Sequence, residues 1–238
     1  MGLAPGYEGS EDTVVMPYRF DEHYREDVRL ADGQRAVIRC LRPADRVLLE
    51  DGFGRLSVES RYLRFFAAKD HLSDAELKYL TEIDGVTHFA LGAVRENPDG
   101  TFEGLGVARF IVMPERPDLA EPAITVVDDC HGLGLGTVLM SRLIEAAAER
   151  GVHWFRCHLL GENRAMRHLL LDVSDDVSFD TADDGVLTAT FPVPGSRGEV
   201  PVFEAIGDSA ARRILKGAAE KMLALVPSHA RRGNSEVG

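Results

Sequence analysis

A glycine-rich turn is the part of the sequence most suited to binding a ligand. Between residues 126 and 137 the chain reads VVDDCHGLGLGT, with glycines at 132, 134 and 136. Glycine lets the backbone turn sharply, so that several N–H groups can converge on one point. A helix that begins at this turn adds the partial positive charge of its N-terminus. The turn is therefore predicted to hold a phosphate or pyrophosphate group.

Three phosphate-binding loops compete for this pattern. A P-loop requires a lysine after its last glycine, but Gly136 is followed by Thr137. A dinucleotide fingerprint requires a third glycine where Thr137 or Leu139 stands, and an acidic residue after the next strand, which is missing. The acetyl-CoA loop, Q/R-x-x-G-x-G/A, fits with His131 in its first position and Gly134 and Gly136 in its glycine positions. A lone glycine turn can also be an ordinary connection, and the flanking strand and helix favour the cofactor loop.

Two other groups of reactive side chains are weaker candidates. Cys130 and His131 could act as nucleophile and base, but neighbours in a tight turn rarely reach each other. His153, Cys157 and His158 could bind a metal, but strand alternation places His158 on the face opposite the other two. We therefore expect buried or structural side chains there, and no metal.

Hydrophobic periodicity surrounds the turn with alternating strands and helices. Alternation predicts strands over 34–42, 87–94, 105–112, 121–127 and 152–159, and two more between 177 and 193. Helical spacing and capping residues predict six helices: after Pro43, from Ser57 to Phe66, after the Ser73–Glu76 capping box, over 135–150, over 163–171 and one between 203 and 226. The helix after Pro43 is expected to bury Val47, Leu48 and Phe53.

Composition limits the classes of protein to consider. The chain has 238 residues, is 45% hydrophobic and 28% charged, and has no apolar run long enough to span a membrane. Its net charge of −12 argues against a nucleic-acid partner and suits a cationic acceptor, although acidity can also serve solubility alone. The three cysteines, Cys40, Cys130 and Cys157, form no disulfide pattern. Together with an N-terminus unlike a secretion signal, they indicate a cytoplasmic protein.

Three further segments make the chain resemble a known family. Residues 159–167, LLGENRAMR, resemble the Asn-x-x-Met segment that follows the cofactor loop in the GNAT superfamily of N-acetyltransferases. Residues 37–45, VIRCLRPAD, and 55–66, RLSVESRYLRFF, are similar to the catalytic domain of bacterial Pat-type protein lysine acetyltransferases. The matches span residues 35 to 170. The resemblance implies an α/β (α+β) fold with a mixed, mostly antiparallel sheet, splayed between the family's fourth and fifth strands and flanked by helices.

The resemblance also implies roles for particular residues. Glu121 heads the segment EPAITV, which is similar to the segment that carries the family's general base, although Pro122 departs from it. Without the resemblance, Glu121 would read as a solvated residue at a strand end. Thr125 and Val126 are expected to pair with the pantetheine arm, with an oxyanion donor near a strand bulge at Val126. The remaining acetyl-CoA contacts are implied at His131, Gly132, Leu133, Gly134, Leu135, Gly136, Thr137, Asn163 and Met166. Because every tyrosine lies at position 79 or earlier, we expect solvent to protonate the departing thiolate.

These observations predict a single catalytic domain and leave its acceptor open. We expect a flexible arm over 1–25, the GNAT domain over 26–200, a C-terminal helix over 201–226 and a disordered tail over 227–238. The leading hypothesis is acetylation of lysines on a protein, possible targets including an acyl-CoA synthetase. The alternatives are a small-molecule amine acetyltransferase and a non-catalytic, regulatory acyl-CoA-binding module.

Overall fold

The structure, a computed structural model, describes residues 18–181 and 185–195. Its centre is one eight-stranded sheet with the order β1-β2-β3-β4-β5-β6-β8-β7. The strands are β1 (Arg25–Arg29), β2 (Arg35–Cys40), β3 (His88–Glu96), β4 (Phe102–Met113), β5 (Arg116–Val126), β6 (Trp154–Leu160), β7 (Ser178–Thr181) and β8 (Val186–Pro192). All neighbouring strands are antiparallel except β5 and β6, which are parallel. The predicted mixed, mostly antiparallel sheet is thus confirmed.

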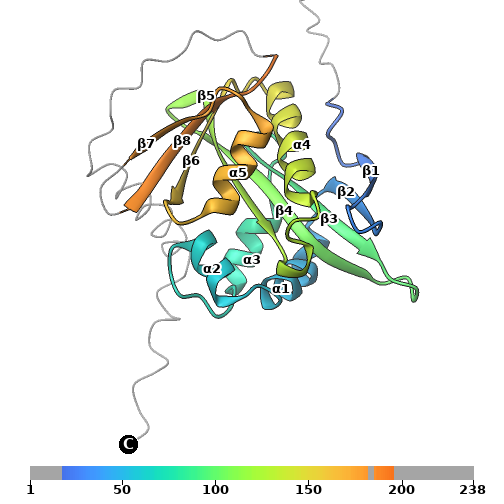
Figure 1. The fold of residues 1–238 in the computed structure, drawn as a ribbon. Coiled ribbons are helices and arrows are strands. Elements are labelled where there is room, and N and C mark those ends of the chain that lie inside the picture. The colour runs from blue at the N-terminus through green and yellow to red at the C-terminus, as the bar shows by residue number, and fades with distance from the viewer. Residues whose placement is uncertain (1–17, 182–184, 196–238) are drawn as a thin grey trace, which may run out of the picture.

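Helices lie on both faces of this sheet (Figure 1). Helices α4 (Leu135–Glu149) and α5 (Arg164–Val173) pack side by side, and α4 contacts β3, β4 and β5. Helices α1 (Arg46–Gly54), α2 (Val58–Phe65) and α3 (Asp74–Thr81) form a separate group, in which α1 packs on β4. Short 3-10 turns, η1 (Pro43–Asp45) and η2 (Asp128–Cys130), precede α1 and the glycine-rich turn. None of the helices in the described part of the chain has the length and apolar character that a membrane crossing needs.

The two helical groups bury two separate apolar clusters. The main core lies between the sheet and α4, and it includes Ala108, Phe110, Leu139 and Phe155. A smaller cluster, Phe53, Leu56, Leu72, Leu77 and Leu80, joins α1 to α3. Because side chains alternate along a strand, the one residue of β4 between Ala108 and Phe110 points to the α1 side. This places Arg109 under the smaller helical group.

Local sequence signals located most of these elements. The predicted capping box is present: Glu76 N–H donates to Ser73 Oγ at 3.3 Å, and Ser73 N–H donates to Glu76 Oε2 at 2.8 Å. β5 begins at Arg116, five residues before the predicted start, so Glu121 lies within the strand and not at its head. Val47 was predicted to be buried, but it is 62% exposed.

The N-terminal part of the domain differs from the expectation of a flexible arm over 1–25. Strand β1 begins at Arg25, and just before it Phe20 and Tyr24 are buried in the main core, with ring centroids 4.5 Å apart. Residues 18–25 are thus packed against the domain. The rest of the arm, the predicted helix over 201–226 and the predicted tail over 227–238 lie outside the described residues.

Candidate active site

Strands β5 and β6 separate in the middle of the sheet. They pair only at Leu119↔Trp154 and Ala120↔Phe155. On its other side β5 stays paired with β4 as far as Val126. From Glu121 onward, the edge of β5 that faces β6 is therefore open, which is the predicted splay.

Backbone hydrogen bonds determine which residues of β5 face this gap. Val127 N–H donates to Leu105 O at 3.0 Å, and His153 N–H donates to Asp118 O at 2.8 Å. Because pairing alternates along an antiparallel strand, the odd-numbered residues of β5 bond to β4 and the even-numbered residues face β6. Pro122, Ile124 and Val126 thus present their backbone groups to the gap.

Pro122 stands where the parallel pairing stops. It lies opposite Phe110 of β4 at a position where β4 requires no donor, so it costs no hydrogen bond on that side. On the β6 side, proline has no N–H to extend the ladder beyond Ala120. The residue that departs from the family pattern is compatible with β5–β4 pairing and helps to keep the gap open.

The backbone geometry corrects two of the sequence-based expectations. Thr125 is odd-numbered, so its backbone pairs with Val107 of β4 and is not free to pair with a ligand in the gap. The β4–β5 register runs without a shift from Val112↔Ala120 to Gly106↔Val126, so the expected bulge near Val126 is not present in this stretch. Val126 does face the gap, and its carbonyl accepts a hydrogen bond from His131 Nε2 at 2.9 Å.

The glycine-rich turn lies at the end of this gap and opens helix α4. Gly132 and Gly134 have φ of 72° and 82°, a region that favours glycine, and Gly134 is the N-cap of α4. In the described structure, no backbone carbonyl accepts from the N–H groups of 132–137. The side chain of Leu135 is fully buried, so the backbone of the turn is the part available to a ligand. A row of free donors at a helix N-terminus suits an anionic group.

Helix α5 begins beside the turn. A Cβ placed on Gly136 would meet Leu169 of α5 at 3.8 Å. Asn163 is the N-cap of α5, where its Oδ1 accepts the N–H of Met166 at 3.0 Å. Met166 packs partly buried against the main core. The side-chain amide of Asn163 keeps its N–H donors for another partner, whereas its oxygen is engaged in capping.

An ionic network joins the turn to the segment between α1 and α2. Arg55 Nη2 donates to Asp129 Oδ2 at 2.6 Å, and its Nη1 lies 3.0 Å from Gly104 O and 2.5 Å from Glu103 Oε1. Ser57 N–H donates to Asp128 Oδ2 at 3.0 Å. The hydrogen bond from Arg55 lowers the pKa of Asp129. The N-terminal end of the Arg55–Phe66 block therefore holds the turn in place.

Glu121 projects from the opposite face, toward α1–α3. It lies opposite Ile111 of β4, and Ile111 lies opposite His88 of β3, so these three residues form a row across the sheet. Burial raises the pKa of the Glu121 carboxyl, and the positive charge of Arg64 partly opposes this rise. A partly buried carboxylate with a raised pKa is suited to accept a proton near neutral pH.

Several polar residues around Glu121 were not found from the sequence. Tyr79 lies over His88, with ring centroids 5.0 Å apart, and Glu121 and Arg109 both affect the pKa of Tyr79, which burial raises. One signal was available for Arg109, the only charged residue in the apolar run 105–112. Tyr79 lies on a helix distant in sequence, and only the fold brings it here.

The weaker candidates stay separate in the structure. The His131 ring contacts the Val126 carbonyl, and the Cys130 thiol is buried. Burial raises the pKa of Cys157 to about 12, and His158 Nδ1 lies 3.1 Å from Thr188 Oγ1. Within 18–181 and 185–195, no group of three or more histidine, cysteine or acidic side chains is placed to hold a metal.

Comparison with known proteins agrees with this architecture. The model of the Acetyltransferase (GNAT) family matches residues 56–171. The chain is 35% identical over 148 residues to Acetyltransferase PA5475 of Pseudomonas aeruginosa, covering 62% of this chain and 77% of that protein. It is 33% identical over 143 residues to Acetyltransferase Pat of Mycolicibacterium smegmatis, covering 60% of this chain and 42% of the longer relative.

A solved structure is also similar to this one. The GNAT domain of S. lividans PAT superposes with a TM-score of 0.64 at 28% identity, covering 73% of this chain and 99% of that domain. The resemblance to the Pat-type catalytic domain is thus confirmed in both sequence and fold. The chain belongs to the GNAT family of acetyltransferases and is an N-acetyltransferase.

Proposed function

We propose that this enzyme transfers an acetyl group from acetyl-CoA to a lysine side chain of a protein, with Glu121 as the general base. One observation carries the proposal: the open edge of β5 connects the free N–H groups of the glycine-rich turn with the level of Glu121. A cofactor that binds its pyrophosphate at the turn can extend its arm along this edge. Its thioester then arrives beside the only carboxylate of β5 in this stretch.

The cofactor contacts follow from the donors that face the gap. The N–H groups of residues 132–137 bind the pyrophosphate, and the backbone of Ile124 and the N–H of Val126 pair with the pantetheine amides. The amide nitrogen of Asn163 adds a donor from α5. An N–H on this edge near Val126 also stabilises the oxyanion that develops on the thioester carbonyl.

The chemistry is a direct transfer. A lysine ammonium has an ordinary pKa near 10.4 and must lose a proton before it can attack. Glu121 accepts this proton, the amine nitrogen forms a bond to the thioester carbon and loses its second proton to solvent, and the C–S bond breaks. The CoA thiolate then takes a proton from solvent. The products are the N-acetyl amide, CoA thiol and one proton.

Lysine as the acceptor is supported by the similarity to proteins named Pat. A small amine remains a second candidate acceptor, because a cavity lined largely by apolar side chains lies under α1 and reaches Arg109, the diagonal neighbour of Glu121 on this face of the sheet. We also propose a cytoplasmic location, because Cys40, Cys130 and Cys157 are buried as free thiols.

Acetyl transfer from labelled acetyl-CoA tests the proposal. The acceptors are a panel of acyl-CoA synthetases and other proteins, and a panel of polyamines and aminoglycosides. Glu121→Gln should lose turnover and keep CoA affinity, whereas Glu96→Gln, the same change at the exposed end of β3, should keep both. Unchanged turnover in Glu121→Gln would remove Glu121 from the mechanism. Binding of CoA with no turnover on any acceptor would favour a non-catalytic module.

A further inference from the structure

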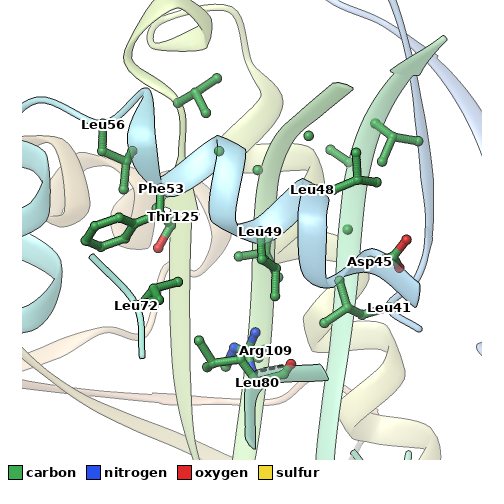
Figure 2. Close-up of a pocket in the computed structure, with 18 of the residues that line it drawn as sticks. Leu41, Asp45, Leu48, Leu49, Phe53, Leu56, Leu72, Leu80, Arg109 and Thr125 are labelled. Atoms are coloured by element: carbon green, nitrogen blue, oxygen red, sulfur yellow. Dashed lines mark hydrogen bonds between the residues drawn. The ribbon is translucent and has the colours of Figure 1, made fainter. Parts of the chain in front are cut away.

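The cavity under α1 combines apolar walls with three arginines, one of which, Arg39, is already paired with Asp45 in the same wall. Figure 2 shows Arg109 among the leucines of this cavity, with a dashed line to Leu80. Arg64 also lines it, from the C-terminal turn of α2. The apolar lining includes Leu41, Leu48, Leu49, Phe53, Leu56 and Leu72.

Arg109 is buried without a carboxylate partner among the described residues. It is 4% exposed, and its Nη1 donates to Leu80 O at 3.1 Å and lies 3.1 Å from His88 Nε2. Burial lowers the pKa of His88 to about 4, so this histidine is neutral and its Nε2 accepts a hydrogen bond from Arg109 Nη1. The Nε and Nη2 groups of Arg109 have no partner in the described structure.

Two other largely buried arginines, Arg39 and Arg150, are each paired with a carboxylate. Arg39 lies 2.6 Å from Asp45, and Arg150 lies 3.7 Å from Glu149. A buried guanidinium normally requires such an anion, because desolvation of an uncompensated charge is costly. Arg109 has instead a second cation nearby: burial and the charge of Arg64 both lower its pKa. Two neighbouring cations in one cavity are the arrangement that binds an anion.

The arginines lie beside the proposed base. Arg109 pairs with Ala123 and Ile111 pairs with Glu121, so Arg109 and Glu121 are diagonal neighbours on one face of the sheet, with Cα atoms roughly 7–8 Å apart. Arg64 is close enough to both to affect their pKa values. An acceptor whose amine reaches Glu121 can therefore place a carboxylate on the guanidinium groups only if its amine and its carboxylate are a few bonds apart.

We propose that this cavity binds free α-amino acids with apolar side chains, and that the enzyme acetylates their amines. The inference rests on the proposed Glu121-dependent transfer and adds an acceptor class to it. The carboxylate accepts hydrogen bonds from Arg109 and Arg64, the side chain packs on the leucines, and the ammonium gives its proton to Glu121. Its nitrogen then attacks the thioester, the C–S bond breaks, and CoA thiol, an N-acetyl amino acid and one proton result. The ε-amine of a protein lysine has no carboxylate at this distance.

Three matched acceptors test the role of the carboxylate: L-leucine, L-leucinamide and 3-methylbutylamine. At a single pH, kcat/KM should be on the order of 10- to 100-fold higher for leucine than for leucinamide, the range expected for charge-assisted hydrogen bonds. The amine of leucinamide is less basic, so ease of proton loss alone would favour the amide. A wild-type enzyme that prefers leucinamide, or that does not distinguish the two, overturns the inference.

Variants test which side chains bind the carboxylate. Arg109→Gln keeps a donor for Leu80 O and should bring the leucine-to-leucinamide ratio near one. Because Arg109→Gln can disturb folding, Arg64→Gln, on a helix with no buried residue, is tested in parallel and should reduce the ratio several-fold. Arg142→Gln, which removes a partly buried arginine from its pair with Glu26, should leave the ratio unchanged. A ratio that persists in every folded variant at 64 and 109 overturns the assignment.

A binding measurement separates this inference from the proposed function. N-acetyl-L-leucine should raise the melting temperature of the wild type and of Glu121→Gln, whereas N-acetyl-L-leucinamide should not. Acetylation of other amines that depends on Glu121, without any carboxylate preference, would refute the inference and leave the proposed function standing. Carboxylate binding that depends on Arg109, without turnover on any amine, would support the anion site and refute the proposed transfer.

Discussion

Arg55 connects the α1–α2 segment to the cofactor turn, and its replacement by methionine should reveal the strength of this connection. Methionine preserves most of the apolar stem and removes the three polar contacts. The Arg55 and Glu103 side chains are 27% and 28% exposed, whereas Asp129 is 63% exposed. The contact with Glu103 therefore stabilises more than the contact with Asp129.

The magnitude can be assembled from these contacts. The half-buried pair with Glu103 contributes about 1–2 kcal/mol, less than a full charge-assisted bond because Glu103 keeps Arg95 at 2.6 Å. The bond to Gly104 O adds about 1 kcal/mol, and the exposed pair with Asp129 adds at most about 0.5 kcal/mol. Arg55→Met should thus lose about 2–3 kcal/mol, or roughly 5–10 °C in melting temperature for a domain of this size.

Chemical and thermal denaturation measure the loss, and calorimetric titration with CoA measures its effect on the turn. Arg46→Met is the matched control, because Arg46 pairs with an Asp74 side chain that is 92% exposed and should change stability by less than about 0.5 kcal/mol. Without Arg55, the negative charge of Asp129 is no longer paired and should also weaken the binding of anionic CoA. This effect should be stronger at low salt than at high salt. Equal stability losses in the two variants, or a CoA affinity that is unchanged at every salt concentration, would refute the role given to Arg55.

Three further predictions concern the cofactor and the base. His131→Ala should weaken CoA binding several-fold and His131→Gln should restore it, because glutamine can donate to the Val126 carbonyl; calorimetry decides, and equal affinities in the two variants would count against this role. Asn163→Asp should keep the α5 cap and the melting temperature but weaken CoA binding, whereas Asn163→Ala should lose about 1 kcal/mol of stability as well; a variant with aspartate that binds CoA normally would exclude the amide contact. Activity should rise with pH through the pKa of Glu121, since only the ionised carboxylate accepts a proton. Arg64→Gln should move this rise to higher pH, because the charge of Arg64 lowers the pKa of Glu121. A pH profile that does not move in Arg64→Gln would contradict the coupling between the two residues.

Local signals in the sequence were sufficient for most elements and for the turn. The capping box at Ser73, the alternation of 105–112 and the glycines before α4 each act within a few residues, so they can be read without tertiary contacts. Strand β1 was missed because its sequence, REDVR, contains a single apolar residue. It is an edge strand, which β2 pairs on one side only, so its backbone pairing depends on little side-chain burial.

The cluster around Glu121 could be predicted only in part. Glu121 followed from the family resemblance, whereas its burial and its position within β5 depend on where β5 begins. Arg64, Tyr79 and Arg109 come from two helices and a strand that are distant in sequence, and no periodicity links them. To predict that the backbone of Val126 faces the gap and that of Thr125 pairs with β4, one must also know the register between β4 and β5.

The gap between β5 and β6 creates two strand edges inside a sheet, where most proteins have none. Unpaired N–H and C=O groups on a strand edge can recruit an extended segment of another chain and so promote self-association. Here Pro122 removes one donor from the edge, and the His131 ring occupies the acceptor at Val126. The pantetheine arm of CoA has few amides and can still bind along this edge. A polypeptide strand would need the hydrogen-bonding groups that Pro122 lacks and His131 occupies. The opening is therefore protected against aggregation in the absence of a ligand.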